Sequence, residues 1–407
     1  TVTGRELCLA LYSQNILAYD ENEYRMLAAG GEEYAFQFIR QKISDIEITP
    51  AQLALDPCSA GCVVTDVNTG EVLALVTYPS YDNNKFSGTV DADYYNKLNN
   101  DLSLPLFNNA TQAQKAPGST FKPIIAAAAL EEGVVSLTDT VTCTGQYQEI
   151  TPHLKCWIYP GAHGVLDVVG GIQNSCNVFM AEMGHRFSLH EDGTYDPEKG
   201  IETIRKYAAM FGLDETSGIE ISERSPHMTT ENPEASSIGQ STNQYSNVQL
   251  ARYISAIANR GTVFSLSLLD KMTDSQGNLI EDFTPEVRSH ADMAESTWDA
   301  VQLGMRRVIS NGSARRIFSD LEVDIAGKTG TAEEIKNGHK INHAFFVSFA
   351  PYDNPEIAVT VNIPYGYSSS NAATAAKNIY RFYYGYTGLE AVLDNSASSV
   401  SNVEIGD

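Results

Sequence analysis

The stretch Pro117-Gly118-Ser119-Thr120-Phe121-Lys122-Pro123 opens a run rich in alanine and isoleucine that continues to Leu130. Because the Pro-Gly pair breaks the chain, we expect Ser119 to start a buried helix. Ser119 and Lys122 then share one face of its first turn, where unpaired backbone N–H groups favour negative charge. A lysine base beside a serine can activate the hydroxyl for attack on a carbonyl. An N-cap serine followed by a surface lysine would give the same pattern.

A second signal, Ser175-Cys176-Asn177, precedes an apolar run over residues 178–183. We expect the tripeptide on a loop at the start of a helix. Its serine hydroxyl can relay a proton between Lys122 and Ser119, and its asparagine amide can orient the lysine and a substrate amide. Taken alone, the tripeptide is better explained as an ordinary helix cap.

The third signal, Lys328-Thr329-Gly330-Thr331, lies in a strand-like run over residues 325–332. The two threonines point the same way from a strand, so that with the lysine they make a site for a carboxylate. The glycine between them marks a close approach to the backbone and lets a peptide substrate pair with the strand edge. A backbone N–H of this strand, together with that of Ser119, can form an oxyanion hole.

The order of elements along the chain indicates the fold. Apolar residues at three- and four-residue steps predict helices over residues 6–17, 32–46, 119–130, 172–183, 201–211, 249–259, 297–309 and 372–384. Strands are predicted over residues 62–67, 72–77, 325–335, 344–350 and 356–363. The turns at residues 68–71 and at Asn337-Gly338 are typical of hairpins. Two strands come early, three come late and helices fill the middle, which fits a sheet with a helical insertion.

The chain is expected to contain three parts. At 407 residues it exceeds the usual size of a single domain. We assign residues 1–54 to a helical segment, 55–390 to the main domain and 391–407 to a Ser- and acid-rich tail that should be disordered. No apolar run reaches the ~20 residues that a membrane helix needs. The first residues also lack a signal-peptide pattern, so we expect an export or anchor segment to be absent from this chain.

Charge and cysteine content limit the classes of ligand. The chain has 27 basic and 51 acidic residues, a net charge of −24, which argues against nucleic acid as a partner. Cys143 and Cys156 flank a turn-rich stretch and could form a disulfide outside the cell, or remain as two thiols. Cys58 and Cys62 have no second cluster nearby, and no histidine pair has a metal-ligand spacing. We therefore expect no metal and no cofactor.

Taken together, the three motifs resemble the S-x-x-K, S-x-N and K-T-G signature of the penicillin-binding proteins and active-site serine β-lactamases. The resemblance covers roughly residues 58–388. Further stretches are similar to high-molecular-mass penicillin-binding proteins: Thr69-Gly70-Glu71-Val72-Leu73-Ala74, Tyr78-Pro79-Ser80-Tyr81-Asp82, His163-Gly164, Ile257-Ala258-Asn259-Arg260-Gly261 and His343-Ala344-Phe345-Phe346. The resemblance implies an α/β fold, with an antiparallel sheet of about five strands flanked by helices and an all-helical subdomain. It also implies a D,D-transpeptidase of peptidoglycan synthesis.

The resemblance implies roles for the first two motifs in acyl transfer. Ser119 would attack the penultimate D-Ala carbonyl of a D-Ala-D-Ala stem peptide and release the terminal D-Ala. Lys122 would be the general base, Ser175 the proton relay, and Asn177 would orient the substrate and the lysine. An amine of a second stem peptide would then accept the acyl group.

The third motif would hold the substrate. Lys328 would supply positive potential, while Thr329 and Thr331 would bind the terminal carboxylate, or that of a β-lactam. Gly330 would lie at the strand edge where the peptide binds. Backbone N–H groups of Ser119 and Thr331 would stabilise the oxyanion.

The resemblance also implies a class, partners and a location. The first 54 residues match neither a glycosyltransferase domain nor a full pedestal domain, so the chain looks like a class B, monofunctional transpeptidase or a fragment of one. Phe345 stands where many relatives have Trp. The implied partners are peptidoglycan stem peptides, β-lactam antibiotics and other cell-wall synthesis proteins. The implied location is the outer face of the bacterial cytoplasmic membrane, with the anchor absent from this chain.

Three other readings remain open. A D,D-carboxypeptidase would use water as acceptor, and the motifs do not decide the acceptor. A serine β-lactamase or β-lactam sensor shares the first and third motifs, but a lactamase needs a water-activating group such as a Glu in an E-x-x-x-N pattern. Glu182 and Glu215 lack the accompanying Asn. A catalytically inactive scaffold is disfavoured because all motif residues are intact.

Overall fold

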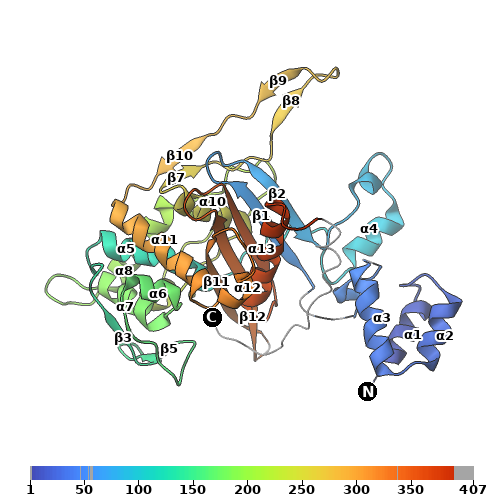
Figure 1. The fold of residues 1–407 in the computed structure, drawn as a ribbon, viewed down its shortest axis with the longest axis horizontal. Helices are drawn as coiled ribbons and strands as arrows, with labels where there is room; N and C mark the ends of the chain where they lie inside the picture. The colour runs from blue at the N-terminus through green and yellow to red at the C-terminus, as the bar shows by residue number, and fades with distance from the viewer. Residues whose placement is uncertain (1, 46, 54, 56–57, 337, 389–407) are drawn as a thin grey trace. The chain divides into compact units, whose positions relative to one another are not determined.

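The computed structural model describes residues 2–45, 47–53, 55, 58–336 and 338–388, and Figure 1 shows their fold. The described residues form two compact units: one contains residues 1–58 and 79–106, and the other contains 59–78 and 107–386. The segment 79–106, which lies inside the predicted main domain, thus belongs to the first unit. The tail predicted for residues 391–407 lies outside the described residues.

The first unit is helical. Its elements are α1 (Gly4–Ser13), α2 (Glu21–Ala29), α3 (Glu32–Ser44), the 3-10 helices η1 (Pro50–Leu53) and η2 (Asn83–Phe86), and α4 (Ala92–Asn99). The predicted helix over residues 6–17 ends early because Asn15 has a φ of 55°. Helix α2 was not predicted, since its sequence is largely polar and it buries only Leu27.

The second unit is built on a five-stranded antiparallel sheet, which confirms the predicted sheet. Its strands are β1 (Ala60–Asp66), β2 (Val72–Tyr78), β11 (Ala326–Lys336), β12 (His339–Ala350) and β13 (Ile357–Ile363). Their order is β11-β12-β13-β1-β2, so strands from both ends of the chain meet where β1 pairs with β13. Strand β11 is therefore an edge strand.

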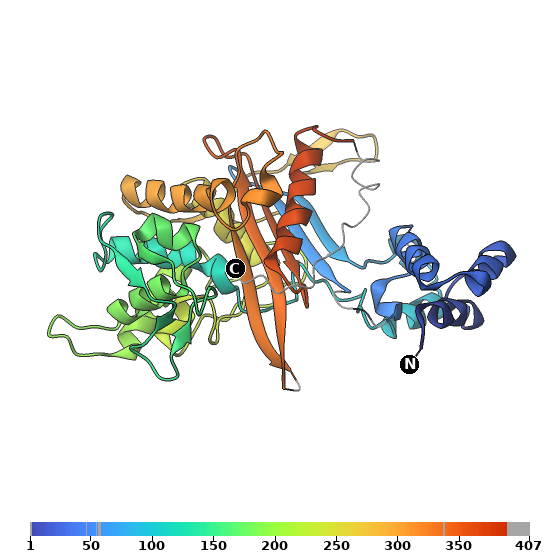
Figure 2. The same cartoon turned by 60° about the horizontal axis from the view of Figure 1, so that its bottom comes forward.

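Helices cover both faces of this sheet (Figures 1 and 2). On one face lies α10 (Asn247–Ala258), whose Asn247 amide donates to the carbonyl of Thr360 in β13 at 3.1 Å. On the other lies α13 (Ser369–Tyr383), where the Tyr380 hydroxyl is 2.9 Å from that of Ser348 in β12. Helices α11 (Glu295–Ser310) and α12 (Arg315–Phe318) complete the layer beside β11 and α13.

A group of helices lies beside the sheet in the same unit (Figure 1). It contains the 3-10 helix η3 (Gly118–Phe121), α5 (Lys122–Glu131), α6 (Val168–Gln173), α7 (Asn177–Phe187), α8 (Pro197–Met210) and α9 (Pro233–Ser237). Helix α5 is buried from Lys122 to Ala129, as expected. The single helix predicted over residues 172–183 is instead two helices, because Ser175 adopts a φ of 51° that an α-helix excludes.

Four short strand pairs complete the unit and were not predicted. They are β3 (Val141–Cys143) with β6 (Gly164–Leu166), β4 (Gln146–Tyr147) with β5 (Leu154–Lys155), β7 (Thr262–Phe264) with β10 (Val287–His290), and β8 (Lys271–Thr273) with β9 (Leu279–Asp282). Such short strands show too few alternations to stand out in a sequence.

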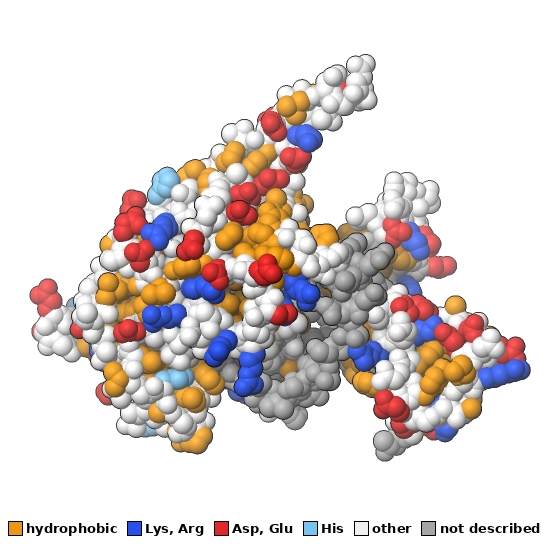
Figure 3. Space-filling model, viewed as in Figure 1, with side chains coloured by type: hydrophobic (Ala, Val, Ile, Leu, Met, Phe, Trp, Pro, Cys, Tyr) orange, Lys and Arg blue, Asp and Glu red, His pale blue; other side chains and the backbone are white. Residues whose placement is uncertain are grey.

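The surface is mixed in character. Figure 3 shows apolar, acidic and basic side chains interspersed over the visible face. Among the residues that the structure describes, no helix is both long enough and apolar enough to span a bilayer.

Candidate active site

The three sequence motifs meet in the second unit, although they are far apart in the chain. Ser119 lies in η3 and is 6% exposed, while Lys122 begins α5 and is fully buried. Ser175 lies in the turn between α6 and α7, and Lys328 is buried in β11. The two buried lysines therefore approach the same turn from opposite elements.

The Ser175 hydroxyl lies between the two lysine ammonium groups. Lys122 Nζ donates to Ser175 Oγ at 3.1 Å, and Lys328 Nζ donates to the same oxygen at 2.8 Å. Lys122 Nζ also donates to the Ser175 carbonyl at 2.7 Å and to Asn177 Oδ1 at 2.6 Å. A hydroxyl with a donor on each side can accept one proton and pass on another, so the arrangement suits proton relay.

The backbone of the Ser175 turn is fixed from both sides. The Ser175 N–H donates to the carbonyl of Ile172 at 3.0 Å, and the Cys176 sulfur accepts from the N–H of Phe179 at 3.4 Å, which caps α7. The Asn177 side-chain NH₂ donates to the carbonyl of Lys155 at 3.1 Å. The asparagine thus links the lysine of the first motif to a separate loop.

Two glycines bring η3 against strand β11. Gly118 has a φ of 54°, and a Cβ there would lie 2.6 Å from the carbonyl oxygen of Thr331. A Cβ at Gly330 would lie 2.7 Å from Cγ2 of Thr120 and 3.0 Å from the carbonyl of Pro117. The close approach expected at Gly330 is therefore made by the chain's own nucleophile turn. This contact places the backbone of Ser119 beside that of Thr331.

A cleft of about 810 Å³ opens at this junction. Ser119, Asn177 and Thr331 line it, together with Lys155 and Trp157 from the loop after β5. Within the described part of the chain, the buried hydroxyl of Thr331 has no hydrogen-bond partner, so it can bind a ligand in the cleft.

Thr329 is placed differently from Thr331. Its side chain is 2% exposed, and its hydroxyl lies 3.2 Å from that of Ser313. The structure therefore places Thr331 at the cleft wall and Thr329 behind it, a distinction that strand alternation alone did not reveal.

Sequence reasoning also missed a charged network at the far end of β11. Glu334 accepts from Lys115 Nζ at 2.6 Å and from Nε2 of buried His343 at 2.9 Å. The Tyr365 N–H donates to His343 Nδ1 at 3.1 Å, which leaves the ring proton on Nε2. These contacts, that of Lys115 foremost, lower the pKa of Glu334 to about 2. The three charged residues belong to separate segments, so no local pattern could have indicated the network.

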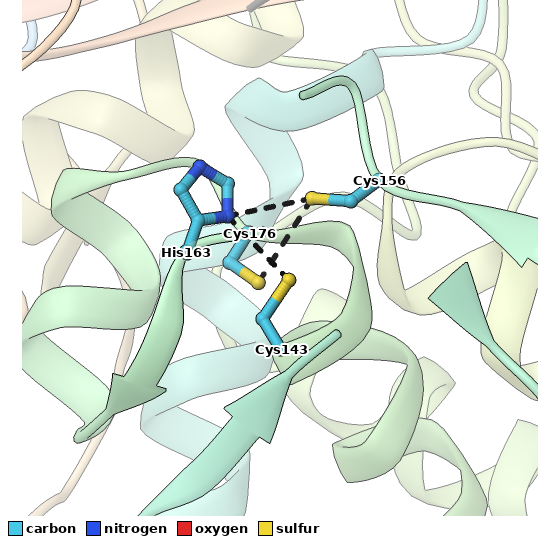
Figure 4. A group of neighbouring side chains, drawn as sticks. All are labelled: Cys143, Cys156, His163 and Cys176. Atoms are coloured by element: carbon cyan, nitrogen blue, oxygen red, sulfur yellow. Dashed lines mark hydrogen bonds between the residues drawn. The ribbon is translucent and has the colours of Figure 1, made fainter. Parts of the chain in front are cut away.

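The structure corrects two expectations about cysteine chemistry. Cys143 and Cys156 are both free thiols, so the predicted disulfide is not formed. Their sulfurs instead gather with Cys176 and His163, and the four potential ligand atoms lie within 4.8 Å of one another (Figure 4). The expectation that no metal-ligating cluster exists was wrong because these residues come from four segments without a spacing motif.

A five-stranded antiparallel sheet with a serine and two buried lysines beside its edge strand is typical of active-site-serine acyltransferases. Residues 60–381 match the penicillin binding protein transpeptidase domain, and the chain belongs to that family. The peptidoglycan D,D-transpeptidase MrdA of Haemophilus influenzae is 30% identical over 359 residues, which cover 79% of this chain and 52% of that protein. The chain thus spans about half the length of the curated relatives it matches.

Solved structures agree with this assignment. The chain is similar to Pseudomonas aeruginosa PBP2 in complex with WCK 5153, with a TM-score of 0.70 and 28% identity, covering 82% of this chain and 75% of that one. It is also similar to penicillin-binding protein A of M. tuberculosis in its ceftriaxone acyl-enzyme complex, with a TM-score of 0.68 and 26% identity, covering 79% and 72%. The transpeptidase fold expected from the sequence is confirmed.

Proposed function

We propose that this chain carries the catalytic domain of a class B, serine-type D,D-transpeptidase that cross-links peptidoglycan stem peptides. The observation that carries the proposal is the Ser175 hydroxyl held at 3.1 Å from Lys122 and 2.8 Å from Lys328, beside the Ser119 turn. Two buried cations repel each other across that hydroxyl. This repulsion favours the neutral amine of Lys122, which is the form that can accept the proton of Ser119.

In the acylation step, Ser119 Oγ attacks the carbonyl carbon of the penultimate D-Ala as its proton passes to Lys122. The resulting oxyanion accepts hydrogen bonds from the backbone N–H groups of Ser119 and Thr331. The contact between Gly118 and Thr331 supports this pairing. The C–N bond then breaks, and Ser175 delivers the proton to the departing amine of D-Ala.

The substrate lies along strand β11. Because β11 is an edge strand, a stem peptide can pair with it next to Gly330. The hydroxyl of Thr331 and the charge of Lys328 bind the terminal carboxylate, while Thr329 supports the strand from behind through Ser313. A β-lactam presents a carboxylate and an amide carbonyl of similar geometry, and it acylates Ser119 in the same way.

The amine of a second stem peptide enters the 810 Å³ cleft and takes the acyl group from Ser119. Such substrates place the enzyme at the outer face of the bacterial cytoplasmic membrane, where other cell-wall synthesis proteins are its partners. The matched range of residues 60–381 supports a catalytic domain over residues 55–390, following the helical segment of residues 1–54.

A peptide ending in D-Ala-D-Ala tests the reaction when it is supplied together with an amine acceptor. We expect release of D-Ala and formation of the cross-linked product by the wild-type chain, and neither by Ser119→Ala. Ser136→Ala, at an exposed loop serine, serves as the matched control and should retain activity. Release of D-Ala without any cross-linked product would indicate a carboxypeptidase and contradict the proposal.

A further inference from the structure

The group of Cys143, Cys156, His163 and Cys176 lies in the interior next to the cleft. The three cysteines are 1%, 2% and 0% exposed, and all three are free thiols. Figure 4 shows the four side chains directed into one space, with His163 Nδ1 turned toward the sulfurs. They come from the end of β3, the residue after β5, the residue before β6 and the N-cap of α7. Nothing in the acyl-transfer mechanism uses them.

The distances within this group fit a tetrahedral metal site. His163 Nδ1 lies 3.7 Å from Cys143 Sγ and 3.5 Å from Cys156 Sγ, and Cys156 Sγ lies 4.0 Å from Cys176 Sγ. With the usual zinc–sulfur and zinc–nitrogen bond lengths, a tetrahedron has sulfur–sulfur edges of about 3.8 Å and sulfur–nitrogen edges of about 3.6 Å. The side chains are therefore already spaced as zinc ligands.

The donor set indicates which metal would bind. Three thiolates and one imidazole are soft and borderline ligands, which suit Zn²⁺ and not the oxygen-seeking Mg²⁺ or Ca²⁺. Four protein ligands fill a tetrahedral shell and leave no position for water or substrate, which is the arrangement of structural zinc sites. We propose that Cys143, Cys156, His163 and Cys176 bind one structural Zn²⁺ ion.

The ion would fasten one wall of the cleft to the second motif. The pairs β3–β6 and β4–β5 contain strands of only two or three residues, which are marginally stable by themselves. The loop between them carries Lys155 and Trp157, which line the cleft. Cys176 is the residue between Ser175 and Asn177, and Asn177 donates to the Lys155 carbonyl at 3.1 Å. The metal thus positions Ser175 and Asn177, a role that rests on the proposed function.

Metal content tests the binding site without reference to activity. The chain is purified without chelators and analysed by elemental mass spectrometry beside Cys143→Ala and a matched control, Cys62→Ala, whose thiol lies in β1 outside the group. We expect about one zinc per chain in the wild type and the control, and its loss in Cys143→Ala. Zinc retained by Cys143→Ala would be adventitious and would overturn the site.

Cobalt substitution of the wild-type chain gives a second measurement that does not depend on the folding of a variant. Co²⁺ in this site should show thiolate charge-transfer absorption and the strong d–d bands of tetrahedral coordination. Weak octahedral bands alone would overturn the proposal. So would a wild-type chain that is free of zinc, whether its unfolded form titrates six thiols or contains a disulfide between Cys143 and Cys156.

The positioning role is tested by penicillin acylation of Ser119. Removal of zinc with a chelator should slow acylation by about tenfold, within the range typical for loss of supporting residues, and added Zn²⁺ should restore it. Zinc removal that leaves the acylation rate unchanged would overturn the positioning role. If penicillin fails to label the zinc-loaded chain, the proposed function and the positioning role both fail. The metal content is measured independently of that outcome.

Discussion

Lys328 donates a hydrogen bond of 2.8 Å to Ser175, although 153 residues separate them in the sequence. This contact joins the sheet to the helical group at the point where Lys122 reaches the same hydroxyl at 3.1 Å. Any variant that removes the hydroxyl leaves two buried ammonium groups facing each other. The chemistry of the site therefore depends on one small side chain.

We predict that Ser175→Ala slows penicillin acylation by about 10² or more, the range for loss of a positioned proton-transfer group. Stopped-flow or quench measurements of the second-order rate constant across pH would test this. Ser188→Ala is a matched control, because this buried serine donates to the carbonyl of Gly184 within α7 and takes no part in the site. An acylation rate for Ser175→Ala equal to that of the control would rule out the relay.

Gly118→Ala should impair both stability and acylation. The added Cβ would lie 2.6 Å from the Thr331 carbonyl at a φ of 54°, and the resulting strain should cost about 1–3 kcal/mol of unfolding free energy. Gly133→Ala is the control, since its φ is 66° but a Cβ there meets nothing within 4 Å. Chemical denaturation and penicillin labelling of both variants separate the effect of φ from that of the contact. Equal losses in the two variants would show that the η3–β11 contact is unimportant.

Glu334 should make stability depend on pH below neutrality. Its pKa is lowered to about 2 from an ordinary value of 4.5, chiefly by Lys115 and then His343. A carboxyl whose pKa falls on folding stabilises the protein above the unfolded pKa, and this stability is lost as pH falls from about 4.5 toward 2.

We expect Glu334→Gln to lower the melting temperature at pH 7 and to flatten its decline in acid. The effect should be about 1 kcal/mol or less because the carboxylate is partly exposed. Glu333→Gln tests the neighbouring carboxylate, which pairs with Lys340 at 2.7 Å at the surface. Identical pH profiles for the two variants would contradict the assignment of the shift to Glu334.

The sheet could be predicted from the sequence because apolar residues run through its strands and a polar turn with Gly70 separates the first two. The three motifs could be predicted because each is a short local pattern. The break at Ser175 could not, since a positive φ at serine is set by the tertiary contacts of the turn.

Other features were missed for a similar reason. Helix α2 buries a single residue, so its apolar periodicity is weak. The cysteine cluster and the Lys115–Glu334–His343 network join segments that are distant in the chain, and only the folded structure brings them together. The assignment of residues 79–106 to the first unit likewise depends on packing that no local pattern records.

The most direct test of the account is the position of the penicillin adduct. The purified chain is incubated with excess benzylpenicillin, digested and analysed by mass spectrometry, beside Ser119→Ala and Ser136→Ala. We predict one stable penicilloyl adduct on Ser119 in the wild type and in Ser136→Ala, and none in Ser119→Ala. An adduct that persists in Ser119→Ala, or rapid hydrolysis of the antibiotic with no stable adduct, would contradict the central claim.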